Sequence, residues 1–110
     1  MIIEPLKAFV EKADEDVVRL NVADRGLVAA IKTLGFVATL EPGIFTLRVA
    51  DDAEKAKVFE DLRSLGVPFS NGKEWCPAEV FEYLRDLNLL SGTFVRVSWT
   101  GSGAYRLVDV

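Results

Sequence analysis

The sequence predicts a two-layer α+β sandwich, in which an antiparallel or mixed sheet of four to five strands is covered by about three helices. Residues 36–50 and 93–110 each alternate apolar and polar side chains around a central turn, as a β-hairpin with one buried face does. Residues 24–34, 52–65 and 77–90 repeat apolar side chains at helical spacing. Apolar hairpin faces and amphipathic helices bury each other, so we expect a helix layer against a sheet.

The composition is typical of one globular domain spanning residues 1–110. The length of 110 residues is close to the commonest domain size, and half of the residues are apolar. The single cysteine allows no internal disulfide, and the sequence contains neither a signal-peptide pattern nor an apolar run of membrane-spanning length. We therefore expect a cytoplasmic protein without membrane contact.

The first part of the chain carries weaker patterns. Residues 5–13 predict a short helix, with Pro5 at its first position. Residues 16–21 predict a short strand, with an extension of the helix as the alternative.

The first hairpin is predicted to turn at Glu41-Pro42-Gly43-Ile44, because proline followed by glycine favours a type II turn. In the predicted register Leu40 lies opposite Phe45. This register places six apolar residues on one face: Phe36, Ala38, Leu40, Phe45, Leu47 and Val49.

Helix boundaries are marked by residue types that cap helices or end them. Aspartates can cap the first two helices, glycines can end them in the left-handed conformation, and a proline at the first position favours a helix start. These residues are Asp24, Asp51 with Glu54, Gly35, Gly66 and Pro77. Residues 67–69 are expected to be extended, because Val67 precedes a proline.

The last hairpin is predicted to turn through a three-residue loop, Gly101-Ser102-Gly103, with Gly103 left-handed. This loop pairs Trp99 with Tyr105 and places Val97 and Leu107 on their face. We expect Trp99 and Tyr105 to be a cross-strand core pair, with a recognition patch as the alternative.

Charge and residue usage exclude several kinds of chemistry. The chain has no histidine, which removes His-based acid–base catalysis and most zinc sites. Its net charge of −4 disfavours phosphate binding, and no phosphate-binding glycine loop is present. We therefore expect a non-catalytic protein with no cofactor and no metal.

Cys76 stands at the predicted start of the last helix, where the helix dipole favours a reactive thiolate. The order of extended segment, loop, Trp75-Cys76-Pro77 and helix is similar to the active-site region of glutaredoxin-like and thioredoxin-like proteins. This resemblance implies a thiol-dependent redox protein that uses Cys76. Glu79 stands where those proteins have a second cysteine.

Residues 77–90 followed by the hairpin 93–110 also resemble the recognition helix and wing of a winged-helix protein. That resemblance implies a nucleic-acid-binding or adaptor module. The helix, however, has Glu79, Glu82 and Asp86 on its outer side, which would repel phosphate, and residues 67–76 leave no room for a further helix.

The leading hypothesis is a small acidic protein that binds and inhibits another protein. In size and charge the chain looks like a toxin-neutralising immunity protein or a phage-type inhibitor of a nuclease or other nucleic-acid-acting target, which covers a basic surface with carboxylates. A second copy of the chain is a further candidate partner, through the C-terminal edge strand. The candidate protein-binding residues are Trp75, which we expect to be partly exposed, with Glu79, Glu82, Asp86, Arg96 and Arg106.

Overall fold

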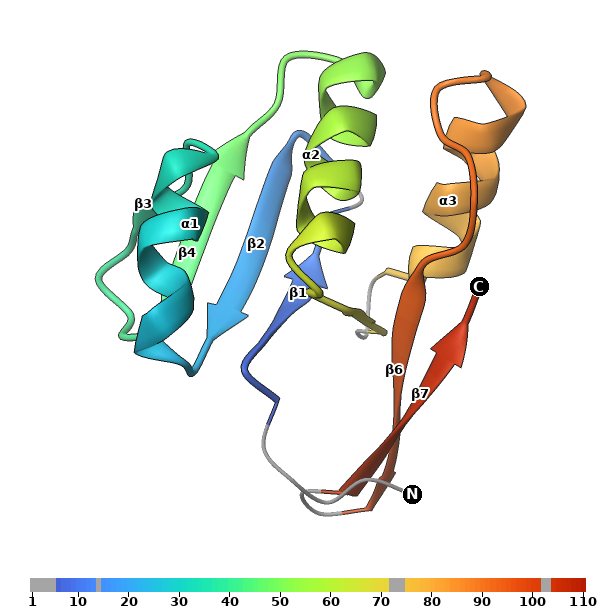
Figure 1. Ribbon diagram of the computed structural model, residues 1–110. Helices are drawn as coiled ribbons and strands as arrows, with labels where there is room; N and C mark the ends of the chain where they lie inside the picture. Colours follow the sequence, from blue (N-terminus) through green and yellow to red (C-terminus); the bar gives the residue numbers. More distant parts are fainter. Residues whose placement is uncertain (1–5, 14, 72–74, 102–103) are drawn as a thin grey trace.

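A computed structural model describes residues 6–13, 15–71, 75–101 and 104–110, and in it one mixed sheet is covered on one face by helices (Figure 1). The strands are β1 (Ala8–Lys12), β2 (Val17–Val22), β3 (Val37–Ala38), β4 (Ile44–Arg48), β5 (Phe69–Ser70), β6 (Val95–Gly101) and β7 (Ala104–Asp109). The helices are the 3₁₀ turn η1 (Arg25–Leu27), α1 (Val28–Thr33), α2 (Asp52–Ser64) and α3 (Pro77–Asp86). The predicted α+β class is confirmed.

The sheet has the strand order β3-β4-β2-β1-β5-β6-β7. The prediction of four to five strands is wrong, because β1 and β5 add to the strands that the sequence pattern reveals. β5 pairs in parallel with both β1 and β6, and it has only two residues, too few to show any alternation. This short strand joins the two halves of the sheet.

β1 occupies most of the segment predicted as a helix, so that prediction is wrong. Ala8 and Val10 are buried while Phe9 and Glu11 are only partly buried, which is the alternation of a strand. β1 lies between β2 and β5, so both of its edges find hydrogen-bonding partners. The apolar residues of β1 fit helical and extended spacing equally well, and pairing with β2 and β5 selects the extended conformation. The strand predicted at residues 16–21 is confirmed as β2.

The turn of the first hairpin is of type II, as predicted. The N–H of Ile44 donates to the carbonyl of Glu41 at 3.1 Å, and Gly43 has a φ of 79°.

The predicted register of this hairpin is wrong by two residues, because Ala38 rather than Leu40 pairs with Phe45. The Thr39 hydroxyl donates to the carbonyls of Glu41 and Ile44 and draws residues 39 and 40 into the turn. Leu40 is consequently fully exposed and not part of the core.

The predicted caps are confirmed. The carboxylate of Asp24 accepts from the N–H of Gly26, and that of Asp51 accepts from the N–H of Glu54, both at 2.8 Å. Gly35 follows the end of α1 with a φ of 106°. The predicted helix 24–34 is divided into η1 and α1, and the helix 52–65 is found as α2.

α3 ends at Asp86, earlier than the predicted residue 90. Asn88 adopts a left-handed φ of 60°, and the N–H of Leu89 donates back to the carbonyl of Leu84. This geometry closes the helix, because asparagine tolerates the left-handed conformation that stops propagation.

The last hairpin has the predicted register, with Trp99 opposite Tyr105 and Val97 opposite Leu107. A register shift between Trp99 and Gly101 precedes the turn. The predicted left-handed Gly103 lies outside the described residues. β7 forms the edge of the sheet, as predicted.

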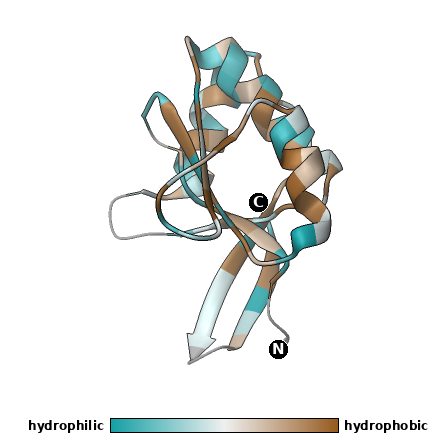
Figure 2. Ribbon diagram, turned by 90° about the vertical axis from the view of Figure 1, so that its left-hand side faces the viewer, coloured by the Kyte–Doolittle hydropathy of each residue, from teal (hydrophilic) through white to brown (hydrophobic). Residues whose placement is uncertain are grey.

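The core lies between the sheet and the helices, and Figure 2 shows hydrophobic segments in both layers. The ring of Phe69 from β5 packs edge-on against Phe59 of α2, Phe81 of α3 and Phe94, with centroid distances of 4.9 to 5.6 Å. Both helices therefore pack on the face of the sheet that carries Phe69.

Candidate functional site

Carboxylates from three separate segments converge on one side of the molecule. Two adjoining hollows share Asp52 and Lys55 in their linings, and the remaining wall residues come from the β1–β2 connection, the β4–α2 connection and the first two turns of α3. The outer side of α3 continues this surface, since residues three and four apart lie on one helix face. We call it the acidic surface, and it comprises Glu15, Asp16, Asp51, Asp52, Glu79, Glu82 and Asp86.

Tyr83 lies within the acidic surface and is 54% exposed. Its hydroxyl donates to Oδ2 of Asp52 at 2.7 Å, which ties α3 to the start of α2. This hydrogen bond and the negative charge of Asp52 raise the pKa of Tyr83 above its ordinary value of 10.0. The phenol is therefore held neutral, with its ring presented to solvent.

The basic residues beside the acidic surface are engaged by the protein itself. Lys55 is buried at its base, and Arg48 pairs with Asp16 at 2.6 Å. Arg85 turns away from the outer side of α3 and donates to the carbonyls of Gly92 and Val110. The surface consequently presents carboxylates and one aromatic ring, a combination that complements a basic protein surface.

The structure places three of the predicted binding residues together. Glu79, Glu82 and Asp86 are all exposed on α3. Trp75 does not join them, and its predicted exposure is wrong. It is only 6% exposed, and its Nε1 donates to the carbonyl of Ser70 at 2.8 Å, so the ring packs against the sheet instead of facing a partner.

The two predicted arginines lie on the β6–β7 hairpin, apart from the carboxylates of α3. Arg106 is exposed. Arg96 is half-buried, and its Nε is buried without a hydrogen-bond partner among the described residues. Arg96 pairs across the strands with Phe69 and Val108, which accounts for its burial.

Cys76 is the N-cap residue of α3, as predicted, and is partly exposed. Its side chain makes no capping hydrogen bond. Within the described ranges, no group of three acidic or cysteine side chains is arranged to hold a metal ion.

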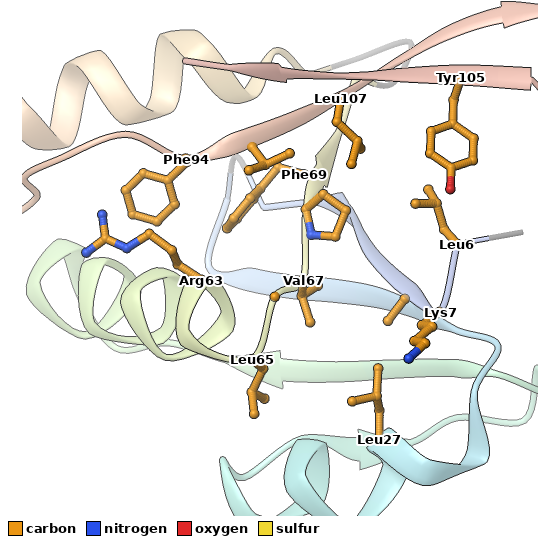
Figure 3. Close-up of a pocket in the computed structure, with 14 residues that line it drawn as sticks. Leu6, Lys7, Leu27, Arg63, Leu65, Val67, Phe69, Phe94, Tyr105 and Leu107 are labelled. Atoms are coloured by element: carbon orange, nitrogen blue, oxygen red, sulfur yellow. The ribbon is translucent and has the colours of Figure 1, made fainter. Parts of the chain in front are cut away.

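A separate pocket of about 410 Å³ lies between the β6–β7 hairpin and the connection from α2 to β5 (Figure 3). Most of its lining is apolar, and Leu27, Val67, Phe69 and Leu107 are examples. Among the described residues, the charged side chains that line it are those of Lys7 and Arg63, and none of the lining residues is acidic. Its character is thus opposite to that of the acidic surface.

Sequence reasoning did not identify Tyr83, the acidic residues outside α3, or the pocket. The sequence explains Asp51 by helix capping, which is one of its roles, and nothing local indicates that α3 packs beside Asp52. Tyr83 does stand between Glu79 and Leu87 on the outer side of α3, and that exposed aromatic position was the available signal.

Comparison with protein-family models, curated proteins and solved structures finds no match to this chain. In the part of the chain that the structure describes, no helix has the length and apolar character needed to cross a membrane.

Proposed function

We propose that this chain is a non-catalytic cytoplasmic protein that binds, and by binding inhibits, another protein with a basic surface. The observation that carries the proposal is the gathering of carboxylates from three segments around the exposed ring of Tyr83. Opposite charge steers such partners together and selects among them, while an aromatic side chain supplies apolar contact area at the centre.

The class of partner we favour is a nuclease or another protein that acts on nucleic acid. Such a protein must present lysines and arginines to phosphate, so its working surface has the charge that the acidic surface complements. Occupying that surface would exclude the nucleic acid, in the manner of an immunity protein or a phage-type inhibitor.

Charge reversal on α3 tests the proposal. We expect the variant Glu79→Lys, Glu82→Lys, Asp86→Lys to bind the partner at least about 100-fold more weakly, because like charges brought together cost several kcal/mol. The matched control is Glu41→Lys, Asp61→Lys, Asp109→Lys, which has the same net charge and changes carboxylates outside the acidic surface.

The measurement is quantitative capture from an extract of the source cells by the wild-type chain and both variants. A partner retained by the wild type and the control but lost by the α3 variant supports the proposal. A partner retained equally by both variants, or lost equally by both, contradicts it.

A winged-helix function is the alternative, because α3 precedes the β6–β7 hairpin. Strand β5 lies between α2 and α3, so these helices do not form a helix-turn-helix, and the outer side of α3 is acidic. A DNA mobility shift at low salt distinguishes the functions, since we expect no shift from the wild type.

A thiol-dependent function at Cys76 is the second alternative. Its test is the rate of Cys76 alkylation against pH. A rate that follows an ordinary thiol, with a pKa of about 8.5, argues against redox chemistry, and a rate that is already maximal near neutral pH argues for it.

The edge strand β7 can also pair with the same strand of a second copy. Phe94 and Val110 exchange backbone hydrogen bonds across the β6–β7 hairpin. Hydrogen-bonded and non-hydrogen-bonded residue pairs alternate along an antiparallel hairpin, so Val97 and Leu107 form a non-hydrogen-bonded pair. The N–H of Leu107 therefore points away from β6. If a homodimer forms through β7, Leu107→Pro should convert it to monomer in sedimentation measurements, because proline removes that outward donor.

A further inference from the structure

The pocket beneath the β6–β7 hairpin exists because the sheet divides there. Among the described residues, only Phe69 and Ser70 of β5 bridge β1 to β6, and the hairpin then diverges from β1 (Figure 1). Strands paired side by side are about 5 Å apart and leave no space for a ligand, whereas diverging strands do. The resulting volume of about 410 Å³ is within the range of small-molecule sites.

The two ends of the pocket differ in their polar groups. In Figure 3, Arg63 and Phe94 lie at one end, and Lys7, Leu6 and Tyr105 lie at the other. The guanidinium of Arg63 is 4.4 Å from the centroid of the Phe94 ring, and its Nη1 donates to the carbonyls of Ser91 and Thr93. Arg63 is therefore already held by the protein.

Among the described residues, the Lys7 and Tyr105 side chains have no such partners. Tyr105 is only 5% exposed, yet no described residue forms a hydrogen bond with its hydroxyl, and none forms an ion pair with the Lys7 ammonium. The Tyr105 hydroxyl lies at the pocket wall, where a ligand can accept its hydrogen bond. One ammonium and one phenol are hydrogen-bond donors suited to the two oxygens of a carboxylate.

We propose that the pocket binds a small amphipathic carboxylate, such as a medium-chain fatty carboxylate. Its carboxylate lies at the end of the pocket that Lys7 and Tyr105 line, and its chain runs along Val67, Phe69 and Leu107 toward Phe94. A cationic amphiphile is disfavoured by Lys7 and Arg63, and none of the described residues that line the pocket has a carboxylate to offset these charges. This inference is independent of the acidic surface, because no described residue belongs to both that surface and the pocket.

The test is titration of the full chain with decanoate, 1-decanol and decyltrimethylammonium, followed by amide chemical shifts in NMR spectra. We expect decanoate to shift the amides of Lys7, Val67 and Leu107, and to leave Glu82 and Tyr83 unchanged. Decanol should bind about tenfold more weakly, because it lacks the charge-assisted hydrogen bonds, and the cation should not bind. Each methylene removed from the carboxylate should weaken binding about fourfold.

Variants of the pocket residues test where the carboxylate and the alkyl chain of the ligand bind. Lys7→Met should weaken decanoate binding about tenfold and leave decanol binding unchanged, whereas Lys57→Met, whose side chain is exposed on α2 outside the pocket, should change neither. Leu107→Trp should abolish binding of both by filling the pocket, because partly exposed Leu107 can be enlarged without entering the closed core.

Equal affinity for decanoate and decanol, or decanoate binding that is insensitive to Lys7→Met, would overturn the assignment of the carboxylate. Shifts confined to residues outside the pocket, or no binding of any probe, would overturn the site itself. Neither result changes the outcome expected for charge reversal at the acidic surface. The proposed ligand pocket can therefore be disproved without disproving the proposed protein-binding function.

Discussion

At the scale of single residues, the most informative interaction is the hydrogen bond from Tyr83 to Asp52. It joins an exposed ring on one helix to the first residue of another. The Asp52 carboxylate accepts a hydrogen bond from the neutral phenol and repels the phenolate, and both effects raise the pKa of Tyr83.

We expect Asp52→Asn to lower the pKa of Tyr83 toward 10.0, because the amide carries no charge and is a weaker acceptor. Folding raises this pKa, so the stabilisation by the pair is fully present below about pH 10 and is lost as pH rises through the folded-state pKa. Ultraviolet titration of phenolate in a Tyr105→Phe background isolates Tyr83 from the other tyrosine. Asp86→Asn is the control, and an equal change in both variants would contradict the assignment to Asp52.

The cap at Asp51 provides a second prediction at this scale. Asp51→Ala should lower the free energy of unfolding by about 1 kcal/mol, because it leaves the N–H of Glu54 without its acceptor. Urea unfolding measures the change. Asp109→Ala, at an exposed strand position, should change it by less than about 0.5 kcal/mol, and similar losses in both variants would show that capping is not the cause.

At the scale of elements, tight turns determine where strands and helices end. Gly43 and Gly66 have φ values of 79° and 77°, so both adopt the left-handed conformation that disfavours other residues. Their surroundings differ. A Cβ at Gly43 would lie 3.0 Å from the carbonyl oxygen of Val22, whereas one at Gly66 would meet nothing within 4 Å.

We therefore expect Gly43→Ala to destabilise the protein more than Gly66→Ala. The Gly66 variant should lose about 1 to 2 kcal/mol for backbone conformation alone. The Gly43 variant should lose that amount and a further cost, because the β2 backbone must move to relieve the contact. Urea unfolding compares them, and equal losses would show that the turn moves away from β2 without cost.

At the scale of the whole molecule, Phe69 links the two halves of the sheet, which are β3-β4-β2-β1 and β6-β7. β5 is the strand that joins β1 to β6, and the ring of Phe69 contacts α2, α3 and the start of the last hairpin. Phe69 has no exposed surface, and its neighbours Phe59 and Phe81 are also fully buried. Loss of this ring leaves a cavity where the halves meet.

We expect Phe69→Ala to cost about 3 to 5 kcal/mol of unfolding free energy. Leu40→Ala, at a fully exposed position, should cost less than about 0.5 kcal/mol. Tryptophan fluorescence reports on Trp75 and Trp99, and circular dichroism reports on the helices. We expect the two signals to change together on unfolding in the wild type, because Phe69 couples the two parts into one cooperative unit. A loss below about 1 kcal/mol for Phe69→Ala would show that the ring does not hold the halves together.

Much of the local structure could be predicted from the sequence because its causes are local. Asp24 and Asp51 accept from N–H groups two and three residues later, and the turn at Pro42-Gly43 depends on the φ values of those two residues. The pairing of Trp99 with Tyr105 follows from alternation on two strands joined by a short turn. The grouping of Glu79, Glu82 and Asp86 likewise follows from helical spacing.

The tertiary structure alone decided what depends on segments far apart in the chain. β1 is a strand because β2 and β5 pair with its edges, and Trp75 is buried because it packs into the core that the sheet and helices form together. The acidic surface requires α3 to lie beside the start of α2, and the pocket requires the hairpin to diverge from β1. Local residue patterns specify turns, caps and faces, whereas the contacts between those faces are chosen by the burial of the whole core.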